Sequence, residues 1–184
     1  MNSCEFIQGK ALVASPYLTD PNFMRSIVYI LKHDAEGALG LVLNRPLNTT
    51  VGKLLEELTE EPISNNELVY CGGPVEGPLM MLHDMPTGAG DERVVYVASD
   101  QDRILTICRQ PEGIYRIFDG YSGWGPEQLE RELLEGGWSV WEIEPDQIFT
   151  DAEKLWEFAR SQIGRSILAS SVNPQLMPDD PTIN

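Results

Sequence analysis

Each of the two histidines in the chain precedes an aspartate, in His33-Asp34 and His83-Asp84. A histidine beside a carboxylate can act as a general base or ligate a metal. Metal-dependent phosphohydrolases of the His-Asp type, however, need further His and Asp ligands, and zinc needs three or four nitrogen or sulfur ligands at a recognisable spacing. Cys4, Cys71 and Cys108 are scattered along the chain. We therefore predict no metal site and interpret both histidines as loop residues that orient turns.

Polar residues at the ends of predicted strands form a candidate ligand site. Polar groups beside exposed glycine backbone are typical of sites on mixed sheets. Asn44 and Arg45 follow one predicted strand, Asp119 ends another, and a Gly72-Gly73-Pro74 turn separates two more. The candidate ligand-binding set is His33, Asn44, Arg45, Gly72, Gly73, His83 and Asp119. The alternative is an ion pair between Arg45 and Asp119 that only fixes the loops. No residue is assigned a catalytic role, and no cofactor is expected.

The remaining motifs have structural as well as functional interpretations. The chain has no Gly-x-Ser-x-Gly elbow and no glycine-rich phosphate loop. Gly123-Trp-Gly-Pro126 precedes a predicted helix and is interpreted as an anion site or as a tight turn that packs Trp124. Asp100-Gln-Asp102 is explained by a capping box as well as by magnesium. The acidic face of the first predicted helix, at Glu56, Glu57, Glu60 and Glu61, indicates a solvated surface or a partner surface.

The charge of the chain excludes some classes of partner. It has 184 residues, 13 basic and 29 acidic, for a net charge of −16 that is spread over both halves. Nucleic-acid binding depends on neutralising phosphates, so we predict no direct DNA binding, and anionic membrane surfaces are disfavoured for the same reason. No apolar run is long enough to span a membrane, and no signal peptide is visible. Three scattered cysteines favour a reducing compartment, so a cytoplasmic location is expected.

Hydrophobic patterns predict mixed α and β structure around one sheet. Strands are expected at residues 10–15, 26–31, 38–43, 68–70, 79–82, 94–98, 115–118 and 138–143, and the second and third form a hairpin with a loop at 33–37. Helices are expected at 51–61 after Thr50, from a Ser99 capping box to 109, from Pro126 to just before Gly136, and from a Thr150 capping box to 163. We predict one α+β domain over residues 1–172 and an extended or disordered tail over 173–184.

Several sequence motifs, taken together, resemble those of the YqgE/AlgH family of bacterial proteins. They are Gly9–Pro16, Asp20–Val28, His33 with Gly37–Pro46, Gly72–Val75, Leu82-His83, Gly120–Trp138 and the closing Pro178–Pro181 with Asn184. Ser122 and Glu127 depart from the family's usual Ala and Gly. The resemblance implies an α+β fold with a mixed, partly barrel-like sheet flanked by helices, in a cytoplasmic bacterial protein. One branch carries a genetic label as a regulator of alginate production. The family offers no agreed catalytic residues to transfer.

Three functional hypotheses follow from these observations. We favour a non-enzymatic binding or regulatory-adaptor protein with an unknown protein or small-molecule partner. The first alternative is an enzyme acting on a small molecule at the strand ends. It requires a pocket where His33, Asn44, Arg45, His83 or Asp119 converge within hydrogen-bond reach. The second alternative is a transcriptional regulator that acts indirectly, because the chain lacks a basic recognition helix.

Overall fold

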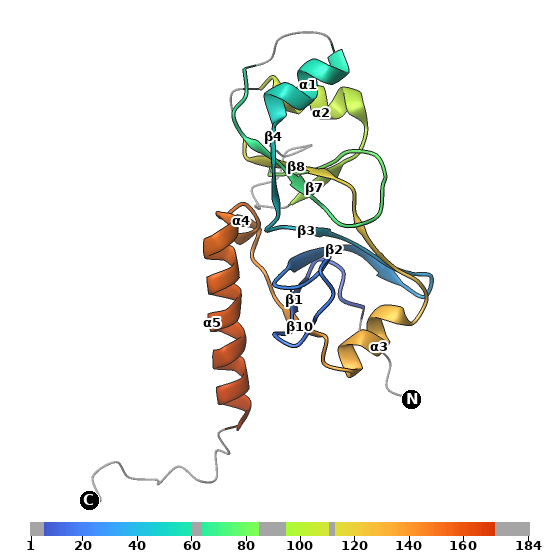
Figure 1. Cartoon of the computed structure of the whole chain (residues 1–184), viewed down its shortest axis with the longest axis vertical. Helices are drawn as coiled ribbons and strands as arrows, with labels where there is room; N and C mark the ends of the chain where they lie inside the picture. Colours follow the sequence, from blue (N-terminus) through green and yellow to red (C-terminus); the bar gives the residue numbers. More distant parts are fainter. Residues whose placement is uncertain (1–5, 60–63, 85–94, 111–112, 172–184) are drawn as a thin grey trace, which may run out of the picture.

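The computed structural model describes residues 6–59, 64–84, 95–110 and 113–171, and two five-stranded sheets form its framework (Figure 1). The first sheet has the order β10-β1-β2-β3-β9 and is antiparallel throughout. Its strands are β1 (Ala11–Ala14), β2 (Ile27–Asp34), β3 (Gly37–Val42), β9 (Ser122–Trp124) and β10 (Trp138–Trp141). The second has the order β4-β5-β8-β6-β7 and contains one parallel pair, β5 with β8. Its strands are β4 (Pro46–Thr50), β5 (Leu68–Cys71), β6 (Met80–His83), β7 (Tyr96–Ala98) and β8 (Tyr115–Asp119).

The α+β class and the single domain are confirmed, but the expectation of one sheet is wrong. Pro46 begins β4 at the edge of the second sheet. An edge strand tolerates proline because the missing N–H need not face a neighbouring strand. Both sheets are open over the described residues, so no closed barrel forms there.

The hairpin between β2 and β3 is tighter than predicted. Asp34 pairs with Gly37, so only Ala35 and Glu36 connect the strands, and the loop expected at residues 33–37 is wrong. Gly37 has φ +127°, and a Cβ there would lie 2.1 Å from the Trp124 carbonyl oxygen. This close approach lets β9 pair with β3 at the hairpin.

Within the described ranges, five helices accompany the sheets: α1 (Val51–Thr59), α2 (Gln101–Cys108), α3 (Gln128–Leu134), α4 (Pro145–Ile148) and α5 (Ala152–Ser171). Asp100, not Ser99, caps α2 and accepts a hydrogen bond from the Arg103 N–H. α3 begins at Gln128 and not at Pro126, because Glu127, the N-cap residue between them, has φ 59° and so lies outside the helical conformation. α5 runs beyond residue 163, and in Figure 1 its distal half extends past the sheets. None of the helices among the described residues combines the length and apolar character needed to cross a membrane.

The apolar residues form three buried clusters. One lies at the face where α5 packs and includes Trp141 and Trp156. Another joins the first sheet to α3 through Trp124 and Trp138, and the third joins the second sheet to α1 and α2. Large aromatic rings are expected in the core, and none of the four tryptophans is more than 9% exposed. Leu134 is 89% exposed, because α3 directs Leu129 inward instead.

The Gly72–Pro74 turn lies where the two sheets meet. The Val42 N–H donates to the Gly72 carbonyl at 2.9 Å, and the Gly72 N–H donates to the Asp119 carbonyl at 2.8 Å. A Cβ on Gly72 would lie 2.2 Å from the Gly120 carbonyl oxygen. The turn is therefore a packed junction with a buried Gly72, not the exposed glycine backbone that the sequence suggested.

Arg116 on β8 is a second connection between the sheets, and the sequence analysis did not single it out. Its Nη1 donates to the carbonyls of Leu43 and Ile148, both at 2.9 Å, and its Nη2 donates to the Thr150 carbonyl at 3.0 Å. The guanidinium lies 4.2 Å from the centre of the Tyr70 ring. Burial lowers the pKa of Arg116 from its ordinary value. The side chain ties β3 and the segment around α4 to the second sheet.

Candidate functional site

The candidate site is a cleft of about 480 Å³ beside the N-terminal half of α5. Three segments border it: the turn before β2, the link between β3 and β4, and the first turns of α5. The lining residues are Met24, Arg25, Asn44, Arg45, Pro46, Ala152, Glu153, Trp156 and Glu157. We call this feature the α5 cleft. Its volume lies within the range of small-molecule sites, and it includes Asn44 and Arg45 of the predicted ligand set.

Asn44 and Arg45 fix the turn that forms one wall of the cleft. The Asn44 carbonyl Oδ1 accepts from the Ile27 N–H at 3.0 Å, and its Nδ2 donates to the Arg25 carbonyl at 2.9 Å. Arg45 Nη2 donates to the carbonyls of Pro21 and Met24 at 3.1 and 3.2 Å. The alternative ion pair between Arg45 and Asp119 does not form in the described structure, because the Arg45 guanidinium is held by this turn.

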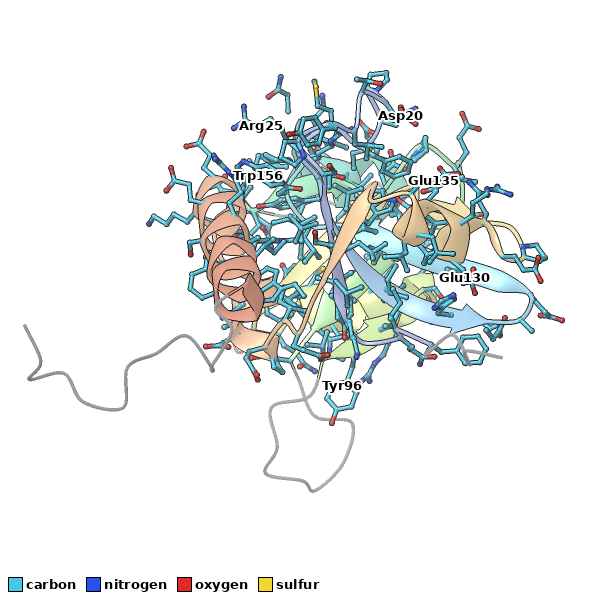
Figure 2. The ribbon with its side chains drawn as sticks, turned by 90° about the horizontal axis from the view of Figure 1, so that it is seen from below. Asp20, Arg25, Tyr96, Glu130, Glu135 and Trp156 are labelled. Carbon is cyan, nitrogen blue, oxygen red and sulfur yellow. The ribbon has the colours of Figure 1, made fainter. Side chains whose placement is uncertain are left out.

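The same turn holds Arg25 in an uncommon backbone conformation. Its φ is 58°, the left-handed region that residues other than glycine rarely occupy and that costs about 1–3 kcal/mol. The hydrogen bond from Asn44 to the Arg25 carbonyl and the Met24 N–H bond to the Asp20 carbonyl, at 2.7 Å, hold the backbone there. The Arg25 Cζ then lies 5.8 Å from the centre of the Trp156 ring, and Figure 2 shows the two side chains together at one end of α5. The turn thus directs an exposed cation to the mouth of the cleft.

Side chains of opposite charge line the α5 cleft from different segments of the chain. Arg25 and Arg45 come from the turn and the β3–β4 link, whereas Glu153 and Glu157 come from α5. Within the described ranges, no ion pair joins these arginines to these glutamates. The cleft is therefore electrically polarised from one wall to the other.

His33 lies outside this cleft and has structural partners. It is buried, its Nδ1 accepts from the Ile7 N–H at 3.2 Å, and its Nε2 lies 3.0 Å from Glu130 Oε1 on α3. Because Nδ1 accepts, the ring proton belongs on Nε2, which donates to Glu130. The Phe6 ring packs edge-on against the imidazole. His33 thus ties the segment before β1 and helix α3 to the first sheet.

The other predicted residues fall in two further places. His83 ends β6 opposite Tyr115, is buried, and stacks on Tyr96 at 5.5 Å between ring centres. Asp119 is at the other end of β8, next to the Gly72 turn. The structure therefore brings Asn44 and Arg45 together in the cleft and Gly72, Gly73 and Asp119 together at the sheet junction, with both histidines elsewhere.

The proposed anion site before α3 is already occupied by a side chain. The Gly125 N–H donates to Gln128 Oε1 at 3.0 Å, which satisfies the backbone donor that an anion would have bound. In the part of the chain that the structure describes, no group of three or more His, Cys, Asp or Glu side chains is arranged to hold a metal ion.

The sequence analysis missed Arg25, Glu153, Trp156 and Glu157 as site residues. The Asp20-Pro-Asn sequence is typical of a turn, and the Asn22 N–H does donate to Asp20 Oδ1 at 2.8 Å, but nothing in it marks Arg25. Most of the Trp156 ring is buried, as packing alone would explain. Only the docking of α5 beside a turn far away in the sequence reveals that these residues share a cleft.

Comparison with known proteins places the chain in a family. Residues 11–168 match the profile of the AlgH-like family, DUF179. The chain belongs to the AlgH-like family. A UPF0301 protein of Streptomyces coelicolor is 40% identical, over 100% of this chain and 98% of the relative. The solution structure of AlgH from Pseudomonas aeruginosa superposes with a TM-score of 0.73 at 27% identity, covering 94% of this chain and 98% of that one.

A second solved relative supports the fold alone. The crystal structure of protein DIP2367 from Corynebacterium diphtheriae has a TM-score of 0.67 at 22% identity, over 88% of this chain and 90% of the other. The family resemblance expected from the sequence motifs is thus confirmed, and members of the family are found in bacteria.

Proposed function

We propose that this AlgH-like chain is a non-enzymatic binding protein, with the α5 cleft as the site where it captures a small charged molecule. The observation that carries the proposal is the polarised cleft itself. Two arginines and two glutamates border a volume of about 480 Å³ without pairing with each other across it. Charged side chains without ion-pair partners at the mouth of a cleft are suited to a ligand that supplies the missing charges.

The cleft has groups for recognition on a fixed framework. Arg45 hydrogen-bonds to the turn through Nη2, and its Nη1 and Nε carry further N–H donors for a ligand. Arg25 is fixed through its backbone and by contact with Trp156. A wall that is already ordered before binding loses less conformational entropy when a ligand arrives, which favours affinity.

The positions of the histidines support binding over catalysis. The enzyme hypothesis required a pocket where His33, Asn44, Arg45, His83 or Asp119 converge, and of these the α5 cleft is lined by Asn44 and Arg45 but by neither histidine. His33 instead bonds to Ile7 and Glu130, and His83 stacks on Tyr96 at the far end of the second sheet.

The α5 cleft joins three separate segments, so an occupant would hold α5 more firmly against the sheets. An adaptor protein could use this change in how firmly α5 is held to report to a partner protein that the cleft is occupied.

A ligand screen tests the proposal. The full chain would be screened by thermal shift against a library of small carboxylates, phosphates, amino acids and peptides, and hits would be measured by calorimetry. Arg25→Gln should weaken binding at least about tenfold, as expected for a lost charge-assisted hydrogen bond. Arg103→Gln, an exposed arginine on α2, is the matched control and should bind as the wild type does.

Two results would contradict the proposal. One is a library in which no compound raises the melting temperature in a way that depends on Arg25. The other is a bound compound that mass spectrometry shows to be chemically converted during incubation, because this would favour the enzyme hypothesis.

A further inference from the structure

We infer that the ligand of the α5 cleft is a zwitterion, namely a free amino acid or a short peptide with unblocked amino and carboxyl ends. This inference rests on the proposed binding function and adds the chemical class of the ligand. It follows from the separation of charge in the cleft, where each wall is complementary to one end of such a molecule.

The arginine wall is suited to a carboxylate. A guanidinium presents planar N–H donors whose geometry matches the two oxygens of a carboxylate. Arg45 is anchored through Nη2 to the Pro21 and Met24 carbonyls, which orients the rest of its guanidinium. Arg25 lies beside it, directed by the constrained turn and by the face of Trp156.

The wall formed by α5 is suited to an ammonium group. Glu153 and Glu157 are one helical turn apart, so they lie on the same face of α5, and both are exposed. Like charges at this spacing are mildly destabilising for an isolated helix, and a cation placed between them would relieve the repulsion. The two carboxylates therefore attract the positive end of a ligand whose negative end lies on the arginines.

The glutamates also decide against a simple anion. A phosphate or a dicarboxylate would gain from the arginines but would be repelled by Glu153 and Glu157, in a protein with a net charge of −16. An amino group on the ligand converts that repulsion to attraction. Met24, 53% exposed, and Pro46 form an apolar part of the lining against which a ligand side chain can pack.

Calorimetry with chemically blocked ligands tests the inference. The wild-type chain would be titrated with the common L-amino acids and a set of dipeptides, and the best binder would then be compared with its N-acetyl and amide derivatives. We expect each derivative to bind at least about tenfold more weakly, because each removes one of the two charges that the walls recognise.

Charge variants supply the second arm of the test. Glu157→Gln should weaken binding of the free ligand at least about tenfold and leave binding of the N-acetyl derivative unchanged, because that derivative has no ammonium group. Glu135→Gln is the matched control, because Glu135 is an exposed residue at the C-terminal end of α3 that lies away from Arg25 in Figure 2, and it should change the binding of neither compound. Melting curves of both variants would verify that they fold.

The outcomes separate this inference from the proposed function. If the N-acetyl derivative or inorganic phosphate binds as tightly as the free zwitterion and still depends on Arg25, the ligand is an anion. The inference of a zwitterionic ligand is then wrong, and the proposed binding function stands. If no amino acid or peptide binds, the inference is overturned, and the library screen decides the binding function by itself.

Discussion

Trp124 provides the sharpest test of how the Gly120–Trp138 segment contributes to this protein. The ring is 5% exposed between β9, the turn before β2 and α3. It stacks on Phe23 at 5.8 Å and meets Trp138 edge-on at 6.1 Å. Its Nε1–H donates to Glu132 Oε2 at 3.0 Å, an oxygen that also accepts from Trp138 Nε1 at 2.9 Å. The residue therefore contributes both packing and a part-buried hydrogen bond.

Replacing Trp124 by alanine should lower the free energy of unfolding by about 4 kcal/mol. Truncation of a buried tryptophan costs about 3–5 kcal/mol, which includes the cavity that remains. The two ring contacts and the hydrogen bond favour the middle of that range over its lower limit. The upper limit is not expected because Glu132 retains its bonds to Trp138 and to Gln128, so no carboxylate is left buried without a donor. For a chain of this length the melting temperature should fall by about 8–16 °C.

Urea unfolding followed by circular dichroism would measure the change in the free energy of unfolding. Trp124→Phe keeps an aromatic ring but loses the Nε1–H donor, and we expect it to cost about 1–2 kcal/mol. Leu134→Ala is the matched control in the same segment, because Leu134 is 89% exposed, and it should stay within about 0.5 kcal/mol of the wild type. An alanine variant at Trp124 within about 1 kcal/mol of the wild type would refute the architectural role. It would favour Trp124 as part of a recognition surface, above all if partner binding were lost.

Other features of the structure lead to further measurable expectations. Arg116→Met should lower the free energy of unfolding by about 3 kcal/mol or more in the same urea assay, because it removes the donor of two buried hydrogen bonds and one part-buried one to backbone carbonyls. A change below about 1 kcal/mol would contradict its role between the sheets. Gly72→Ala should prevent stable folding or lower the free energy of unfolding by several kcal/mol, since its Cβ would overlap a backbone oxygen. Gly164→Ala is the control, because a Cβ at that position of α5 would enter open space; it should be neutral or stabilising by up to about 1 kcal/mol. Burial raises the pKa of Tyr115 to about 12, above the value of 10.0 in the unfolded chain, so its contribution to stability is present below pH 10 and is lost as the pH rises towards 12. Tyr115→Phe should therefore show a shallower loss of stability across that alkaline range, and an unchanged slope would refute this assignment.

The parts of the fold that depend on neighbours in the sequence were predictable. Alternating and continuous apolar runs indicated the strands, and the caps at Thr50 and near Asp100 indicated helix starts, because these signals arise from contacts within a few residues. Boundaries were less reliable where a single residue has two compatible roles. Pro46 lies a few residues beyond the end of β3 and begins β4, and β9 was hidden within a glycine-rich turn. The predicted tail at residues 173–184 lies outside the described residues.

The sequence by itself determined the family, the mixed α and β class, the acidic charge and the packing role of the tryptophans, because each is a property of composition or of short patterns. Only the tertiary structure decided that the strands divide into two sheets and that Gly72 is a packed junction between them. It also separated His33 and His83 from Arg45, and it placed Arg25 over Trp156. The physical reason is that a cleft is formed by surfaces from segments distant in the chain, and neither residue spacing nor local propensity specifies how α5 packs against a turn that precedes β2.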